Sequence, residues 1–169
     1  MPSFTIHIAI ANEYYKKNKN EIKNYKNFID GIISPDLNTN KSITHYGIWD
    51  EHNSYINFDM FFKDSKVDIL SDFWKGYFLH LVTDHFFYNN YFKQEYITAI
   101  NEKNNLYNDF YFLNSSLIND YKIEFIEDIK EFMELKKGKC RYLDYKKIKE
   151  FINEISNKKI IDYKLMLVK

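Results

Sequence analysis

Apolar residues recur three and four positions apart along most of the chain, the spacing that places them on one face of an α-helix. Ser3 precedes the first such stretch and Ser71 precedes the most apolar one, and either hydroxyl can cap a helix. The pattern predicts helices over residues 3–18, 20–31, 55–62, 72–91, 94–101, 107–119, 121–136 and 144–156. Residues 160–168 fit either a helix or a strand.

Turn-forming residues are scarce in the sequence. The chain has four glycines and two prolines, too few for a sheet protein with many hairpins. Its length suits one domain with a single core, so we expect an all-α, single-domain helical bundle over residues 1–169. Residues 33–51 lack a regular period, and a long irregular connection inside a compact domain is usually functional.

Composition and charge exclude several classes of protein. Hydrophobic residues make up 45% of the chain and aromatic residues 19%, which excludes a disordered protein. Basic and acidic residues number 24 each and no basic stripe is present, so we expect no nucleic-acid polymer as a partner. No apolar run approaches the roughly 18 residues needed to cross a bilayer, and the start lacks a signal-peptide pattern. With Cys140 as the single cysteine, these features predict a cytoplasmic protein without a transmembrane segment.

His80 and Asp84 lie four residues apart in the apolar stretch 73–87. A helix places such residues on one face, with about 6 Å between their Cβ atoms, so that both can reach one ion. Burying either group is costly unless a partner offsets its desolvation, and a divalent cation satisfies both. Gly76, one turn earlier, leaves room beside the pair. The alternative is a simple hydrogen bond between the two side chains, which is more common for such a pair taken alone.

Three further residues are candidate metal ligands. His7 lies in an apolar segment near the start of the chain, Asp36 follows a proline, and His45 follows shortly after it. Each has an ordinary interpretation as well, His7 as a core histidine and Asp36 as a turn or cap residue. Because three of the five histidines lie in or next to apolar segments, we favour a metal site with the ligands His7, Asp36, His45, His80 and Asp84. His52 and His85 are interpreted as bystanders.

Four segments of the first half of the chain together resemble a known family. They are Met1-Pro2-Ser3 followed by His7, residues 28–36, residues 41–45 and residues 76–84. In this order they resemble the zinc-dependent phospholipase C family, and most closely its small uncharacterised bacterial branch. The later half of the chain contributes only helical character to the resemblance.

The resemblance implies an all-helical bundle with a clustered zinc site, which hydrolyses a phosphodiester with a metal-activated water. Carried over by position, one zinc ion would be held by His45, His80, Asp84 and Asp36, and a neighbouring one by Asp84 and His7. The family builds a further site from histidines and a glutamate, but this chain has no histidine beyond His85 and has Asn90 near one of those positions. We therefore expect one or two metal ions, either zinc or a metal that can replace it, such as manganese.

These residues predict a metal-dependent hydrolase of small phosphoesters. A zinc ion with an open position lowers the pKa of its bound water to about 7 and supplies hydroxide as the nucleophile. Asp36 is the expected catalytic residue, which orients this water or takes its proton. Two residues are candidate substrate contacts. The charge of Lys41 could neutralise a phosphate oxygen, and the ring of Tyr46 could form part of the pocket wall. Two alternatives remain, a degenerate helical binding protein that keeps the scaffold and a structural metal, and a helical domain without metal.

Overall fold

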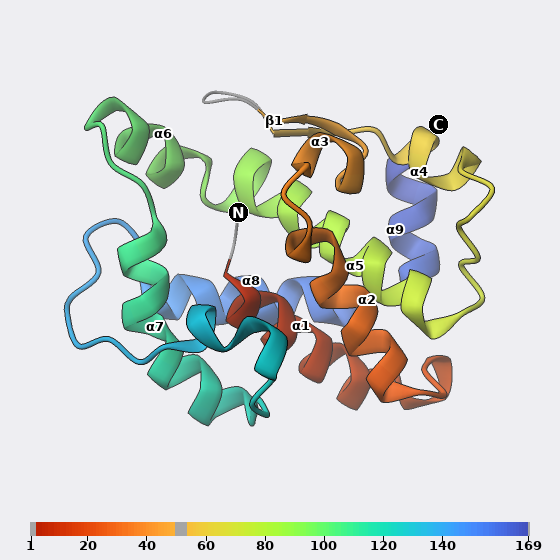
Figure 1. The fold of residues 1–169 in the computed structure, drawn as a ribbon, viewed down its shortest axis with the longest axis horizontal. Helices are drawn as coiled ribbons and strands as arrows, with labels where there is room; N and C mark the ends of the chain where they lie inside the picture. Colours follow the sequence, from red (N-terminus) through yellow and green to blue (C-terminus); the bar gives the residue numbers. More distant parts are fainter. Residues whose placement is uncertain (1–2, 50–53, 169) are drawn as a thin grey trace.

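The computed structural model describes residues 3–49 and 54–168, and it confirms the expected all-α fold (Figure 1). In chain order the elements are α1 (Phe4–Lys17), η1 (Lys19–Glu21), α2 (Tyr25–Leu37), α3 (Lys41–Thr44), β1 (Gly47–Trp49), β2 (Ser54–Ile56), α4 (Phe58–Lys63), α5 (Asp72–Phe86), η2 (Phe87–Tyr91), α6 (Lys93–Asn101), α7 (Tyr107–Tyr121), η3 (Glu127–Met133), α8 (Tyr145–Asn157) and α9 (Ile160–Leu167). Strands β1 and β2 pair antiparallel, with Gly47 opposite Ile56.

Helices α2 and α5 lie side by side through the middle of the molecule (Figure 1). Two glycines allow their close approach. A Cβ atom at Gly31 would lie 1.9 Å from the carbonyl oxygen of Phe73, and one at Gly76 would lie 2.1 Å from that of Phe28. The room expected beside Gly76 is therefore filled by the backbone of α2. This contact brings the carbonyl groups of α2 within reach of side chains on α5.

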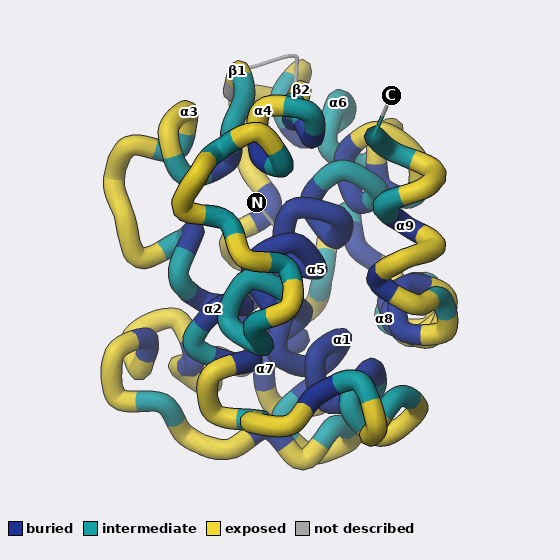
Figure 2. The backbone as a smooth tube through the Cα atoms, turned by 90° about the vertical axis from the view of Figure 1, so that its right-hand side faces the viewer, coloured by how far each residue is buried: buried dark blue, intermediate teal, exposed yellow. Residues whose placement is uncertain are grey.

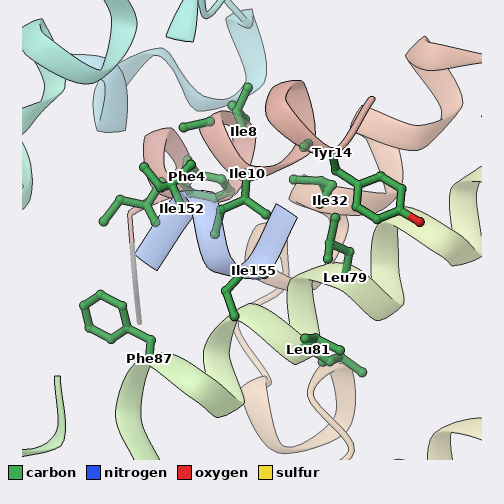
Figure 3. Close-up of a cluster of buried hydrophobic side chains, with 14 of the residues drawn as sticks. Phe4, Ile8, Ile10, Tyr14, Ile32, Leu79, Leu81, Phe87, Ile152 and Ile155 are labelled. Carbon is green, nitrogen blue, oxygen red and sulfur yellow. The ribbon is translucent and has the colours of Figure 1, made fainter. Parts of the chain in front are cut away.

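Helix α1 packs against α2 and α8 and is buried along most of its length. Figure 2 shows buried backbone in α1 and α5 at the centre and exposed positions on the surrounding segments. Ile6, Ile10 and Tyr14 of α1 are fully buried, and Ile152 and Ile155 of α8 belong to the same cluster of apolar side chains (Figure 3). A helix buried on nearly every side shields its polar side chains from water.

The second helix differs from its predicted range of 20–31. Residues Lys19–Glu21 form a short 3-10 turn, and α2 begins at Tyr25, where the side chain of Asn24 accepts a hydrogen bond from a helix amide. The helix then continues through Gly31 and Pro35 to Leu37. Packing against α5 overrides the local tendency of glycine and proline to end a helix.

Three further ranges were predicted wrongly. Residues 33–51, expected to be irregular, contain the end of α2, the single turn of α3 and strand β1. Residues 55–62 divide between β2 and α4 rather than forming one helix. The helix expected over residues 121–136 is absent from this described stretch, because Lys122 adopts a left-handed φ of 54° and ends α7. Ile129 and Met133 have helical spacing, yet the 3-10 segment η3 buries both of them.

The remaining elements agree with the sequence analysis. Ser3 and Ser71 cap α1 and α5 by accepting hydrogen bonds from helix amides, as expected. Helix α5 ends at Phe86 and passes into the π-helical segment η2, and the tail forms helix α9. None of the described helices combines the length and apolar character that crossing a membrane requires.

Candidate metal centre

The five candidate ligands come from separate segments and meet in the interior. His7 lies on α1, Asp36 in the last turn of α2, and His45 directly after α3, whereas His80 and Asp84 share α5. The Asp36 side chain is 3% exposed and the other four are fully buried at 0%. The rings of His7 and His80 are stacked, with 3.9 Å between their centroids. The structure therefore brings together all five residues that the sequence singled out.

Four of these side chains, those of Asp36, His45, His80 and Asp84, place atoms that can ligate a metal close to one another. Nε2 of His45 lies 3.1 Å from Nε2 of His80 and 3.2 Å from Oδ2 of Asp84. Oδ1 of Asp36 lies 3.4 Å from Nε2 of His45 and 3.8 Å from Nε2 of His80. Ligands that sit about 2.1 Å from a tetrahedral zinc ion are about 3.4 Å from one another. The observed separations match the edges of such a site.

Main-chain carbonyl groups orient both imidazole rings. Nδ1 of His80 donates to the carbonyl oxygen of Ile32 at 2.7 Å, and Nδ1 of His45 lies 3.2 Å from that of Lys41. Because a carbonyl oxygen only accepts hydrogen bonds, Nδ1 of His80 carries a hydrogen, whereas Nδ1 of His45 also lies 3.0 Å from the Thr44 hydroxyl, which can donate or accept. The two Nε2 atoms, 3.1 Å apart, can then be bridged by a proton on His45 or by a metal cation.

His7 and Asp84 approach each other without forming an aligned hydrogen bond. Nε2 of His7 lies 3.1 Å from Oδ1 of Asp84. Within the part of the chain that the structure describes, neither nitrogen of His7 and neither oxygen of Asp84 has a hydrogen-bond partner. The Asp84 oxygens still lie in ion-pair contact with three histidines, 3.1 Å from His7, 3.2 Å from His45 and 3.5 Å from His80. Buried, closely spaced nitrogen and carboxylate atoms without aligned hydrogen bonds fit the chemistry of metal ligands.

The charges of the cluster favour a cation. Burial acts against the charged form of His45, but the carboxylates of Asp36 and Asp84 outweigh it and raise its pKa to about 9. Burial also opposes ionisation of Asp84, yet the neighbouring histidines hold its pKa well below the usual range. For His7, burial and the proximity of His80 lower the pKa to about 4, which leaves the ring neutral at pH 7. Two buried carboxylates thus attract positive charge, which a proton or a divalent cation can provide.

Two overlapping groups of ligand atoms are close enough to hold a metal ion. In each group the atoms lie within 4.8 Å of one another, and the groups are His45 with His80 and Asp84, and His7 with Asp36 and His80. Nδ1 of His80 is engaged by Ile32, so the same Nε2 atom serves either group. The buried histidines and aspartates can hold a metal ion, and the identity of that ion stays a prediction.

Lys41 and Tyr46, the predicted substrate contacts, occupy different surroundings. Nζ of Lys41 donates to Oδ1 of Asp36 at 2.9 Å and to the main-chain oxygen of the same residue at 3.0 Å. The hydroxyl of Tyr46 donates to Asp64 at 2.8 Å, and its ring packs edge-on against Phe61. Lys41 therefore lies beside the cluster, whereas Tyr46 belongs to neighbouring aromatic packing.

A cavity of about 450 Å³ opens beside the cluster. Asp36 and Lys41 form part of its wall, and Tyr46 is not among its lining residues. Half of the remaining lining residues are aromatic, namely Phe4, Tyr107, Phe110, Tyr111 and Phe132. Because Asp36 belongs to both the cluster and the wall, a molecule in this cavity would approach the cluster from the Asp36 side.

The residues interpreted as bystanders lie elsewhere. The ring of His85 contacts Phe58 and Phe86 outside the cluster. His52 lies outside the described residues. Asn90 lines a separate hollow of about 620 Å³ beside α6, none of whose lining residues is a candidate ligand.

Sequence reasoning missed two parts of the site. The carbonyl groups of Ile32 and Lys41 orient the imidazoles, but a main-chain group leaves no trace in residue type. The aromatic cavity wall was also missed, because the chain contains fifteen Phe and fifteen Tyr and nothing marks the relevant ones. The one usable signal was the spacing of Tyr107, Phe110 and Tyr111 on one helix.

Comparison of the chain with protein-family models, with curated proteins and with solved structures gives no match. Its function therefore has to be inferred from the chemistry of the site.

Proposed function

We propose that the protein is a metal-dependent hydrolase of small phosphoesters, with zinc or manganese as its metal. The observation that carries this proposal is the pair of Nε2 atoms, of His45 and His80, that face each other at 3.1 Å inside the fold. Carboxylate oxygens of Asp36 and Asp84 lie beside them. Histidine and carboxylate donors directed at one point form the type of ligand set found in zinc hydrolases.

The chain's own residues divide the work in this proposal. His45, His80 and Asp84 hold the ion, which when bound supplies an activated water and a Lewis acid for phosphoryl transfer. Burial opposes the charge of Asp36, but the neighbouring histidines hold its pKa below the usual range, so it is ionised and orients the attacking water. Lys41 fixes this carboxylate and presents positive charge to a phosphate group in the cavity.

We also propose that the chain is a divergent member of the zinc-dependent phospholipase C family. The order of the candidate ligands along the chain and the all-helical fold support this assignment. The absence of histidines after His85 favours one or two ions. The net charge of zero and the cavity volume of about 450 Å³ favour a small substrate.

The test is an assay of the protein loaded with zinc, loaded with manganese or stripped of metal, against a panel of phosphodiesters and phosphomonoesters. We expect turnover that depends on metal and that His80→Ala abolishes, because Nε2 of His80 belongs to both possible ligand groups. His85→Ala removes a histidine outside the cluster from the same helix, and this control should retain turnover. Wild-type turnover no higher than that of His80→Ala on every substrate would contradict the proposal.

A second candidate function is favoured by the enclosure of the ligand atoms. Side-chain exposure in the cluster is at most 3%, and a zinc ion that also took Asp36 as a ligand would have no position left for water. Closed sites of this type are structural. The protein would then be a helical binding protein that retains a metal for stability, and stoichiometric metal without turnover would identify it.

A further inference from the structure

The cavity beside Asp36 has an aromatic wall that phosphoester hydrolysis alone does not require. Phe4 and Phe110, at 6% and 4% exposure, form its enclosed part. Tyr107 and Phe132, at 56% and 47% exposure, lie at its opening. Large aromatic rings left exposed around a hollow are typical of binding sites.

The aromatic residues come from different parts of the chain and pair with one another. The ring of Phe4 on α1 lies 5.0 Å from that of Phe132 on η3, and the two are tilted by 47°. On α7, the rings of Tyr107 and Phe110 lie 6.5 Å apart and meet edge to face. Their positions around one cavity therefore result from the packing of α1, α7 and η3.

The opposite part of the wall is polar and contains Lys41 together with the carboxylates of Asp36 and Asp128. Nζ of Lys41 contacts Asp36, and the Lys41 side chain keeps 29% of its surface exposed. When the cluster holds its metal ion, as the proposed function requires, a ligand that matches both parts has an anionic group for the ion and Lys41 and an apolar group for the rings. Aromatic rings pack especially well with another flat ring, through stacked and edge-to-face contacts. A volume of about 450 Å³ is in the range of small-molecule sites.

We infer that the protein binds phosphoesters whose organic group is a planar aromatic ring, with Phe132 and Tyr107 as the residues that determine this specificity. The inference rests on the proposed function, which assigns the phosphate end to the metal centre. It adds the class of the organic group. The phosphate lies toward Lys41 and Asp36, and the ring lies between α7 and η3.

Two non-hydrolysable phosphonates test the inference without relying on turnover. Phenylphosphonate and methylphosphonate carry the same anionic group and differ in the ring. Calorimetry on the metal-loaded protein should show that phenylphosphonate binds about tenfold more tightly. Adenosine monophosphate and ribose 5-phosphate form a second pair, whose binding is compared in the catalytically impaired Asp36→Asn variant because the wild-type protein is expected to hydrolyse them. The pair with the larger preference shows whether the site favours a nucleobase or a simple aryl group.

Variants of the wall identify where the preference arises. Phe132→Ala and Tyr107→Ala should each reduce the preference for phenylphosphonate by about threefold or more while methylphosphonate binding stays unchanged. The carbonyl of Phe132 accepts a hydrogen bond from Asn114 through the main chain, which this substitution preserves. Phe125→Ala is the matched control, because Phe125 is 67% exposed and does not line this cavity.

The outcomes separate this inference from the proposed function. Equal affinity for the two members of both pairs overturns the aromatic specificity, and the proposed function stands if methyl phosphate and phenyl phosphate are hydrolysed alike. An equal loss of preference in Phe125→Ala also overturns it, since the effect would not come from the cavity. A protein that binds no metal and neither phosphonate overturns both.

Discussion

At the scale of single residues, Asp36 is where the two candidate functions differ. Its Oδ1 atom lies 3.4 Å from Nε2 of His45 and accepts a hydrogen bond from Lys41, and its side chain lines the cavity. A fourth ligand at this position closes the site, whereas a free carboxylate leaves a place for water. The same geometry allows Asp36 to be a metal ligand or to orient a water molecule. A substitution that removes its charge distinguishes these two roles.

Asp36→Asn should lower turnover by about 10²-fold or more if the carboxylate orients the water, because general acid–base groups contribute about 10²–10⁴-fold. Metal content should then stay close to that of the wild-type protein. Steady-state kinetics and elemental analysis of the same preparation measure both quantities. Loss of metal together with turnover would instead assign Asp36 as a ligand, and unchanged values of both would contradict either role.

At the scale of elements, the contact between α2 and α5 sets the geometry of the cluster. Gly31 and Gly76 allow backbone to meet backbone, and this contact brings the carbonyl of Ile32 to Nδ1 of His80. The orientation of the imidazole therefore depends on the separation of two helices. Any side chain inserted between them should affect both stability and the site.

Gly31→Ala should destabilise the protein by about 1–3 kcal/mol, as overpacking of a core does. In an isolated helix the same change is stabilising by about 1 kcal/mol, so the expected sign is opposite to that of helix propensity. The reason is the carbonyl oxygen of Phe73, which would lie 1.9 Å from the new Cβ atom. Urea denaturation measures the difference in the free energy of unfolding.

Gly138→Ala is the matched control for this prediction. A Cβ atom there meets the side-chain ring of Phe112 rather than backbone, and a ring can turn aside. We expect a smaller loss of stability for this variant. A Gly31→Ala protein that is more stable than the wild type would show that the two helices separate without cost.

At the scale of the whole molecule, the cluster joins α1, α2, the segment after α3, and α5. These ligands converge in the folded protein and are separated in the unfolded chain. A metal that binds them stabilises the folded state alone, so the binding free energy adds to the free energy of unfolding.

Removal of the metal by a chelator should lower the melting temperature by roughly 5–15 °C, the shift expected for an ion present well above its dissociation constant. Thermal unfolding followed by circular dichroism measures this difference. His80→Ala should abolish most of it, whereas His85→Ala should preserve it, because His85 lies outside the cluster. Identical melting of loaded and stripped wild-type protein would mean that no bound ion stabilises the fold.

The candidate ligands could be predicted from the sequence because their signals are local. The spacing of four positions from His80 to Asp84 corresponds to about one helical turn, and apolar neighbours imply burial of both groups. The predicted substrate contacts had a weaker basis, because a lysine such as Lys41 is as common on a solvated surface and a tyrosine such as Tyr46 is as common in a core. The structure places Lys41 at the cavity and Tyr46 against Phe61.

The sequence by itself determined the helical class, the capped starts of α1 and α5, and the set of residues able to ligate a metal. Apolar periodicity, capping and desolvation act over a few neighbouring residues, so they can be recognised along the chain. Only the tertiary structure decided which atoms face one another, where α2 ends and which aromatic rings line the cavity. These features depend on contacts between distant segments, above all the close packing of α2 on α5, and no local pattern specifies them.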